Sequence, residues 1–295
     1  MTSTYTTLIS TDDLRNLLAS TNPPLVIDTG FDLADTALGE REWRAGHVPA
    51  SQYLHLDRDL AGAKHSADGG FRGRHPLPER AAFAAVLGRC GVTPARQVVA
   101  LDRQGGMYAA RLWWLLRWMG HDAVAVLDGG VTAWLAAGSA LTADAPTVMP
   151  TSPYLDRAPL TGTTDAKALA RELGRTRLID ARAGERFRGE VEPLDAAAGH
   201  IPGALNRFFK NNLDASGRFK PAAVLRAEFA ALVGLGAGDA LDGAPPPPVV
   251  HSCGSGVTAC HNLLAMTHAG LPGSVLYPGS WSEWSADPAR PIARG

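Results

Sequence analysis

The sequence predicts an α/β protein built from two copies of one domain, each with a mainly parallel sheet flanked by helices. Three observations predict this fold class. Short apolar segments alternate with helical patterns, a set of motifs recurs in the same order about 150 residues later, and 295 residues suffice for two separate cores. We expect domains at residues 1–140 and 162–295, joined by a linker with several prolines at 141–161.

The recurring motifs follow the chain in order. Helices are expected after the Thr-Asp pairs at 11–12 and 164–165, and apolar strands end in aspartate at positions 28 and 180. The segment GHVPA at 46–50 recurs as GHIPGA at 199–204, and GGVTAW at 129–134 is matched by GSWSEW at 279–284. Polar residues common to both copies are expected to cap strand ends and turns: Asp28, Asp180, His47 and His200.

The two copies differ at the residue that follows one pair of matching strands. The strand at 97–101 leads into Asp102, whereas the strand at 248–252 leads into Cys253 and the loop CGSGVTA at 253–259. Backbone N–H groups at the start of a helix favour an anion, so a cysteine placed there is favoured as a thiolate. Glycines let the backbone curl close to the sulfur. The loop therefore predicts sulfur chemistry in the second copy, and the alternative is a buried cysteine that ends a strand.

The loop, the repeat and their spacing resemble the rhodanese superfamily of sulfurtransferases, and the neutral Gly-Ser-Gly loop is similar to that of 3-mercaptopyruvate sulfurtransferases. The resemblance covers nearly the whole chain. It implies two tandem rhodanese-like domains, the first without the catalytic cysteine. It also implies that Cys253 takes a sulfane sulfur from a small-molecule donor, holds it as a persulfide, and passes it to cyanide, a small thiol or a thioredoxin-like protein. No cofactor and no metal are implied.

The resemblance also indicates further site residues. By motif position Arg186 corresponds to the family arginine that binds the donor's anionic group, and Ser255, His75 and Asp57 correspond to a proton relay. Many mercaptopyruvate enzymes carry a second arginine after a Glu-Pro pair, but here Leu194 stands in that place. Backbone groups expected to hold the donor and the persulfide are those of Gly254, Gly256, Val257 and Thr258.

The donor is predicted from charge. Thiosulfate is a compact dianion that a basic loop would meet, yet no lysine or arginine occurs between Val249 and Asn262. 3-Mercaptopyruvate presents a single carboxylate and suits a neutral loop with a separate arginine. We therefore expect a 3-mercaptopyruvate sulfurtransferase. The alternatives are a thiosulfate:cyanide sulfurtransferase and a non-enzymatic persulfide carrier or interaction module.

Two rival sites use the same loop. Cysteine-based phosphatases place an arginine six positions after the nucleophile to grip phosphate, and Ala259 stands there. A zinc site from His251, Cys253, Cys260 and His261 lacks the paired spacing that such sites show. Cys90 and Cys260 are expected to be core thiols, and Trp281 and Trp284 to pack in the core.

The amino-acid composition indicates which classes of binding partner and which cellular compartment to expect. The 28 basic and 29 acidic residues nearly balance, so neither nucleic acid nor an anionic membrane surface is an implied partner. No apolar run approaches the ~20 residues that span a bilayer. The start of the chain lacks the apolar core of a signal peptide, and three cysteines do not make a disulfide framework, so we expect a cytoplasmic protein. A proline-rich stretch at 243–248 predicts a stiff surface connection.

Overall fold

The computed structural model describes residues 4–155, 157–234 and 249–295. The chain divides into two compact units. The first comprises Met1–Gly62, Leu77–Leu160 and Ala215–Arg218, and the second comprises Ala63–Pro76, Thr161–Asp214 and Phe219–Gly295. The segment Ala63–Pro76 therefore belongs to the second unit, although it comes from the first half of the sequence, and Ala215–Arg218 belongs to the first unit. The sequence-based domain boundaries stay a prediction.

The first unit contains a five-stranded parallel sheet in the order β1-β5-β4-β2-β3. Its elements are β1 (Leu8–Ile9), α1 (Thr11–Leu18), β2 (Leu25–Asp28), α2 (Leu38–Ala45), β3 (Gln52–Tyr53), α3 (Leu56–Asp59), α4 (Arg80–Arg89), β4 (Val98–Leu101), α5 (Ala109–Trp118), β5 (Val124–Leu127) and α6 (Gly130–Ala136).

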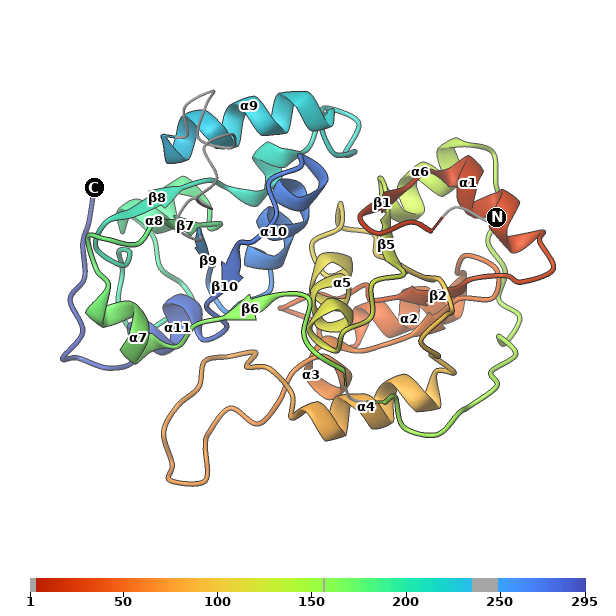
Figure 1. Cartoon of the computed structure of the whole chain (residues 1–295), viewed down its shortest axis with the longest axis horizontal. Helices are drawn as coiled ribbons and strands as arrows, with labels where there is room; N and C mark the ends of the chain where they lie inside the picture. Colours follow the sequence, from red (N-terminus) through yellow and green to blue (C-terminus); the bar gives the residue numbers. More distant parts are fainter. Residues whose placement is uncertain (1–3, 156, 235–248) are drawn as a thin grey trace. The chain divides into compact units, whose positions relative to one another are not determined.

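The second unit repeats this topology, with a parallel sheet in the order β6-β10-β9-β7-β8. Its elements are β6 (Gly162–Thr163), α7 (Ala166–Arg171), β7 (Leu178–Asp180), α8 (Gly184–Arg188), β8 (Ala204–Asn206), the 3₁₀ helix η1 (Phe209–Asn212), α9 (Ala222–Val233), β9 (Val250–Ser252), α10 (Ala259–His268), β10 (Val275–Leu276) and α11 (Ser280–Trp284). The predicted α/β fold with two copies of one sheet is confirmed (Figure 1).

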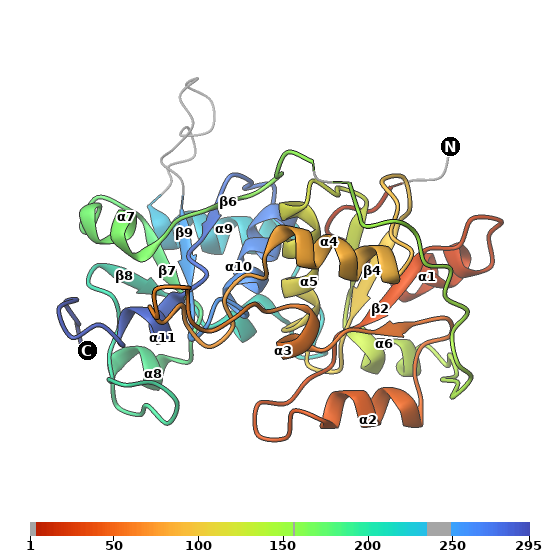
Figure 2. The same cartoon turned by 90° about the horizontal axis from the view of Figure 1, so that it is seen from below.

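Each sheet lies between layers of helices, which explains why its central strands are apolar runs without alternation. Every residue of β2, β4, β5, β7 and β9 is buried. In the second unit, α7 and α11 pack over one face through Leu169, Trp281 and Trp284, while α9 and α10 contact each other on the opposite face (Figure 2). The core positions of both tryptophans agree with the sequence-based expectation.

Local interactions start the helices and turns as the sequence indicates. The hydroxyl of Ser10 accepts the N–H of Asp13 at the start of α1, and the carboxylate of Asp165 accepts the N–H of Ala168 in α7. The recurring histidines have the structural role expected of them. His47 Nδ1 lies 2.8 Å from the carbonyl oxygen of Trp43, and in the second unit His200 Nδ1 lies 2.8 Å from that of Phe187.

Cys90 and Cys260 are buried free thiols, as expected of core residues. Among the described residues, no helix is long and apolar enough to cross a membrane. The proline-rich stretch at 243–248 lies outside the described residues.

Candidate active site

Cys253 stands at the carboxyl end of β9, the central strand of the second sheet, where ligands of parallel α/β sheets bind. It is 1% exposed, and the N–H of Gly256 donates to its Sγ at 3.2 Å. Gly256 has φ +76°, and a Cβ there would lie 2.3 Å from the carbonyl oxygen of Pro278. The tight curl of the backbone around the sulfur therefore requires glycine at this position.

Helix α11 fixes the backbone of the cysteine loop. The N–H groups of Trp281 and Ser282 donate to the carbonyl oxygens of Cys253 and Gly254, each at 2.9 Å. The Ser280 hydroxyl accepts the N–H of Cys253 at 3.1 Å. Ser280 itself has φ +52°, a left-handed conformation that a residue with a side chain rarely adopts. Backbone strain of this kind gathers at functional sites, and here it lies next to Cys253.

Two of the three predicted relay residues meet in the second unit. Ser255 Oγ and His75 Nδ1 are 2.8 Å apart, and both residues are buried. His75 belongs to the segment Ala63–Pro76, which binds α11 because the N–H of Arg74 donates to the Ser282 hydroxyl at 3.1 Å. Asp57 lies on α3 of the first unit, so its place in the relay stays a prediction.

Two guanidinium groups flank the loop after the cysteine. A Cβ on Gly254 would lie 2.9 Å from Arg74 Nη2 and 3.5 Å from Arg186 Nη1, so both arginines approach this glycine closely. We call Arg74 and Arg186 the guanidinium pair. Burial, followed by the like charge of Arg186, lowers the pKa of Arg74 from its ordinary value.

Sequence reasoning predicted Arg186 and missed Arg74. The neutral loop led us to place one arginine near the donor, whereas the fold adds a second from a segment nearly 180 positions earlier in the sequence. The sequence offers one signal for Arg74, which is that it directly precedes His75. Because His75 is predicted to lie beside the cysteine loop, the residue next to it is expected near the same loop.

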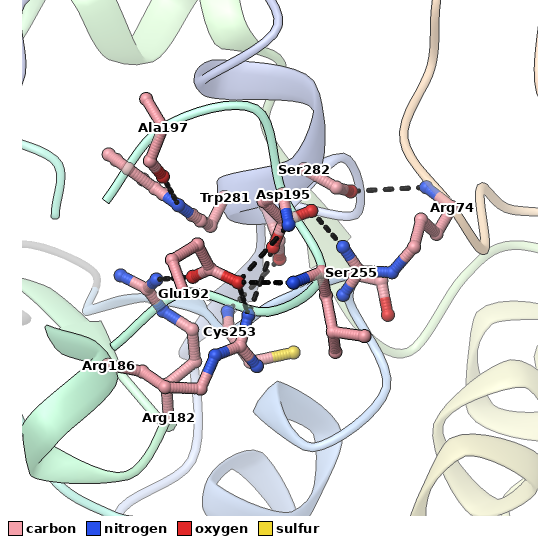
Figure 3. Close-up of polar contacts among 12 residues, drawn as sticks. Arg74, Arg182, Arg186, Glu192, Asp195, Ala197, Cys253, Ser255, Trp281 and Ser282 are labelled. Carbon is pink, nitrogen blue, oxygen red and sulfur yellow. Dashed lines mark hydrogen bonds and ion pairs between the residues drawn. The ribbon is translucent and has the colours of Figure 1, made fainter. Parts of the chain in front are cut away.

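Acidic side chains face these arginines. The Asp195 carboxylate accepts hydrogen bonds from Arg74 and, at 3.0 Å, from Arg186 Nη2. Glu192 accepts from Arg186 Nη2 at 2.6 Å and from Arg182 Nη1 at 3.3 Å. Figure 3 shows this cluster, with Arg74 entering from the 63–76 segment and Arg186 from α8. Asp195 and Glu192 were not predicted as site residues. Glu192 belongs to the Glu-Pro pair at 192–193, which drew attention only to the residue after it, and no local pattern marks Asp195.

The remaining predicted site residues lie in or beside the cysteine loop. Gly254 and Val257 are buried, and Thr258 directly precedes α10. Their contacts with a donor or a persulfide stay a prediction. Within the described ranges, no three His, Cys, Asp or Glu side chains gather as metal ligands would.

The matching loop of the first unit shows what such a backbone holds. Asp102 ends β4 as Cys253 ends β9, and its carboxylate accepts backbone N–H groups at 2.8–2.9 Å from four residues, Gln104, Gly106, Tyr108 and Ala109. The turn between strand and helix therefore forms a nest of N–H groups that binds an anion. In the first unit the group bound by these N–H groups is the side-chain carboxylate of Asp102.

Comparisons with known proteins agree with this geometry. A family model described as Rhodanese-like domain matches residues 10–137 and 164–287. A Pseudomonas aeruginosa protein named "Probable 3-mercaptopyruvate sulfurtransferase" is 45% identical over 92% of each chain. The thiosulfate sulfurtransferase of Cricetulus griseus is 32% identical over 99% of this chain and 96% of its own.

Among solved structures, the 3-mercaptopyruvate sulfurtransferase from Leishmania major superposes with a TM-score of 0.78 at 26% identity, covering 95% of this chain and 74% of that one. Fold, repeat and sequence thus agree. The chain belongs to the rhodanese family, in the form with two rhodanese-like domains in tandem.

Proposed function

We propose that this protein transfers a sulfane sulfur from 3-mercaptopyruvate to a thiophilic acceptor, with Cys253 as the carrier. One observation carries the proposal. A cysteine at a strand end, a hydroxyl–imidazole pair and two guanidinium groups surround the same loop of one unit. The name of the 45% identical relative supports the same donor.

The first half-reaction loads the cysteine. The donor's carboxylate binds the guanidinium pair, and the Cys253 thiolate attacks the donor's sulfur. A new S–S bond forms as the C–S bond breaks, and its electron pair leaves with the carbon as the enolate of pyruvate. The thiol proton of the donor passes through the Ser255–His75 pair to that carbon, so the products are pyruvate and the anionic persulfide of Cys253. The N–H of Gly256, which donates to Cys253 Sγ, stabilises the attacking thiolate before the persulfide forms.

The second half-reaction returns the cysteine. A thiol, a thioredoxin-like protein or cyanide attacks the outer sulfur of the persulfide. The S–S bond breaks, and its electron pair goes back to Cys253 Sγ as a thiolate. Since pyruvate leaves before the acceptor reacts, the kinetics are ping-pong.

A specific observation favours a second candidate, thiosulfate:cyanide sulfurtransferase. Two guanidinium groups beside the loop offer more positive charge than the loop sequence indicates, and relatives named thiosulfate sulfurtransferase align along almost the whole chain. A non-enzymatic persulfide carrier, the third possibility, would form the same adduct without turnover.

The test compares kcat/KM for 3-mercaptopyruvate and thiosulfate with cyanide as the common acceptor. We expect 3-mercaptopyruvate to be the better donor, and a higher kcat/KM for thiosulfate would favour the second candidate. Mass spectrometry after loading with either donor should show an adduct of about 32 Da, one sulfur atom, that is lost in Cys253→Ser together with turnover. Cys260→Ser is the matched control and keeps both. Turnover in Cys253→Ser would refute the assignment.

A further inference from the structure

The two acidic side chains of the site are held in different ways. Glu192 accepts, besides its arginines, the backbone N–H groups of Leu194 and Asp195 at 3.0 and 3.2 Å. Its carboxylate is therefore part of the turn that carries it. Within the described part of the chain, the Asp195 carboxylate binds only Arg74 and Arg186. Glu192 anchors the turn, whereas the side-chain hydrogen bonds of Asp195 to described residues all come from the guanidinium pair.

The guanidinium pair lies where a donor anion must bind. Both arginines flank Gly254, the residue directly after the sulfur carrier. Their side chains are 22% and 18% exposed, so solutes reach them, while the Asp195 side chain between them is only 3% exposed. The Nε atoms of Arg74 and Arg186 are buried and have no partner among the described residues. Both arginines thus hold the Asp195 carboxylate, Arg186 also holds that of Glu192, and the pair retains further N–H donors.

We propose that Asp195 is an internal anion that occupies the carboxylate subsite of the sulfur donor, and that the donor displaces it on binding. This inference rests on the proposed function. It adds a specificity-determining residue, which makes no contact with the reacting sulfur and acts by competing for the guanidinium pair.

When the Asp195 carboxylate turns out into solvent and a donor carboxylate takes its place, the charge bound to the pair stays the same. A donor with a single carboxylate therefore exchanges with Asp195 without adding charge beside the Cys253 thiolate. A dianion such as thiosulfate brings one additional negative charge to the same place, and like charges repel strongly where water is partly excluded. The exchange favours a monocarboxylate donor over a dianion, even though two arginines are present.

The test measures carboxylate binding without turnover. Pyruvate is titrated calorimetrically into Cys253→Ser and into the same protein carrying Asp195→Asn. If Asp195 competes with the ligand, Asp195→Asn lowers the Kd of pyruvate roughly fivefold to tenfold, because Arg74 loses its internal carboxylate and Arg186 keeps only Glu192. Glu190→Gln is the matched control. Glu190 lies two residues after α8 and its carboxylate pairs with exposed Arg188, so this control removes a nearby carboxylate and should leave the Kd unchanged.

An unchanged or higher Kd in Asp195→Asn would overturn the proposal, since it would mean that Asp195 orients the arginines for the ligand. A second measurement needs no variant. Hydrogen exchange of the amides at 196–198, which follow the two amides held by Glu192, should become faster in the wild-type protein with saturating pyruvate as Asp195 is released, and slower or unchanged exchange would contradict displacement. Both readouts are independent of sulfur transfer. A protein that failed to use 3-mercaptopyruvate would refute the proposed function and leave these results standing.

Discussion

Position 194 lacks the arginine that the family pattern places there, and Arg74, from a distant segment of the sequence, lies beside Gly254. A second arginine is expected at position 194, but the leucine there is 48% exposed. The second guanidinium beside Gly254 comes from Arg74 instead. A guanidinium binds a carboxylate through its position and its fork of N–H donors, whatever segment supplies it. The missing arginine therefore does not argue against a carboxylate donor.

The role of the guanidinium pair is tested residue by residue. Arg74→Gln and Arg186→Gln should each raise KM for 3-mercaptopyruvate roughly tenfold to a hundredfold, because each deletes charge-assisted hydrogen bonds to the donor. We expect kcat to change less, since neither side chain bonds the sulfur. Steady-state kinetics with cyanide as acceptor measure both constants.

Arg188→Gln serves as the control for that pair of variants. Arg188 lies on α8 like Arg186, is exposed, and pairs with Glu190. Its replacement should leave KM within about twofold, as expected of an exposed ion pair. An unchanged KM in Arg74→Gln would remove Arg74 from the donor site, and the same result in Arg186→Gln would remove Arg186.

At the scale of elements, the strand–turn–helix units β4–α5 and β9–α10 were predictable because their signals are local. Apolar strands, turn glycines and helix starts each occupy a few adjacent positions, and the repeat shows them twice. The position of the 63–76 segment was not predictable. It depends on contacts such as that of the Arg74 N–H with Ser282, more than 200 positions away in the sequence. Arg74, Glu192 and Asp195 meet through tertiary packing that no local pattern records.

The β4–α5 turn carries a stability prediction. Asp102 satisfies four backbone N–H groups, and its replacement by alanine leaves them unpaired in a buried turn. We expect Asp102→Ala to lower the free energy of unfolding by about 3–5 kcal/mol, because several N–H donors lose their acceptor at once in a buried turn. Urea denaturation followed by far-UV circular dichroism measures the loss.

Asp122→Ala is the comparison for that variant. Asp122 belongs to the same unit and its side chain is 62% exposed in an ion pair with Arg117. Its removal should cost less than about 1 kcal/mol. If both variants lost the same small amount, the nest around Asp102 would contribute nothing to stability.

For the whole molecule, acid stability is coupled to one buried histidine. Burial lowers the pKa of His251, on β9, to about 3, and its Nδ1 has no partner in the described part of the chain. An unfolded histidine titrates near ~6.5. Between these values the unfolded chain binds the proton and the native protein does not, so stability falls as the pH falls below ~6.5 by about 1.4 kcal/mol per pH unit.

The measurement compares urea unfolding of the wild type and His251→Leu at pH 7.5 and pH 5. The wild type should lose about 2 kcal/mol more than the variant over this interval, because leucine takes up no proton. Equal losses would mean that His251 is protonated in the native state or that the second unit does not unfold in the observed transition.

The composition of the second unit limits how far the protein can be divided. A fragment that began at residue 162 would contain the cysteine, its loop and Arg186, yet it would lack both His75 and Arg74, which the chain supplies from before residue 77. The two halves of the sequence are similar, but the half that contains Cys253 does not include all residues of the second unit. Fused alone to another protein, it would carry Cys253 and Ser255 without His75, and only Arg186 of the guanidinium pair.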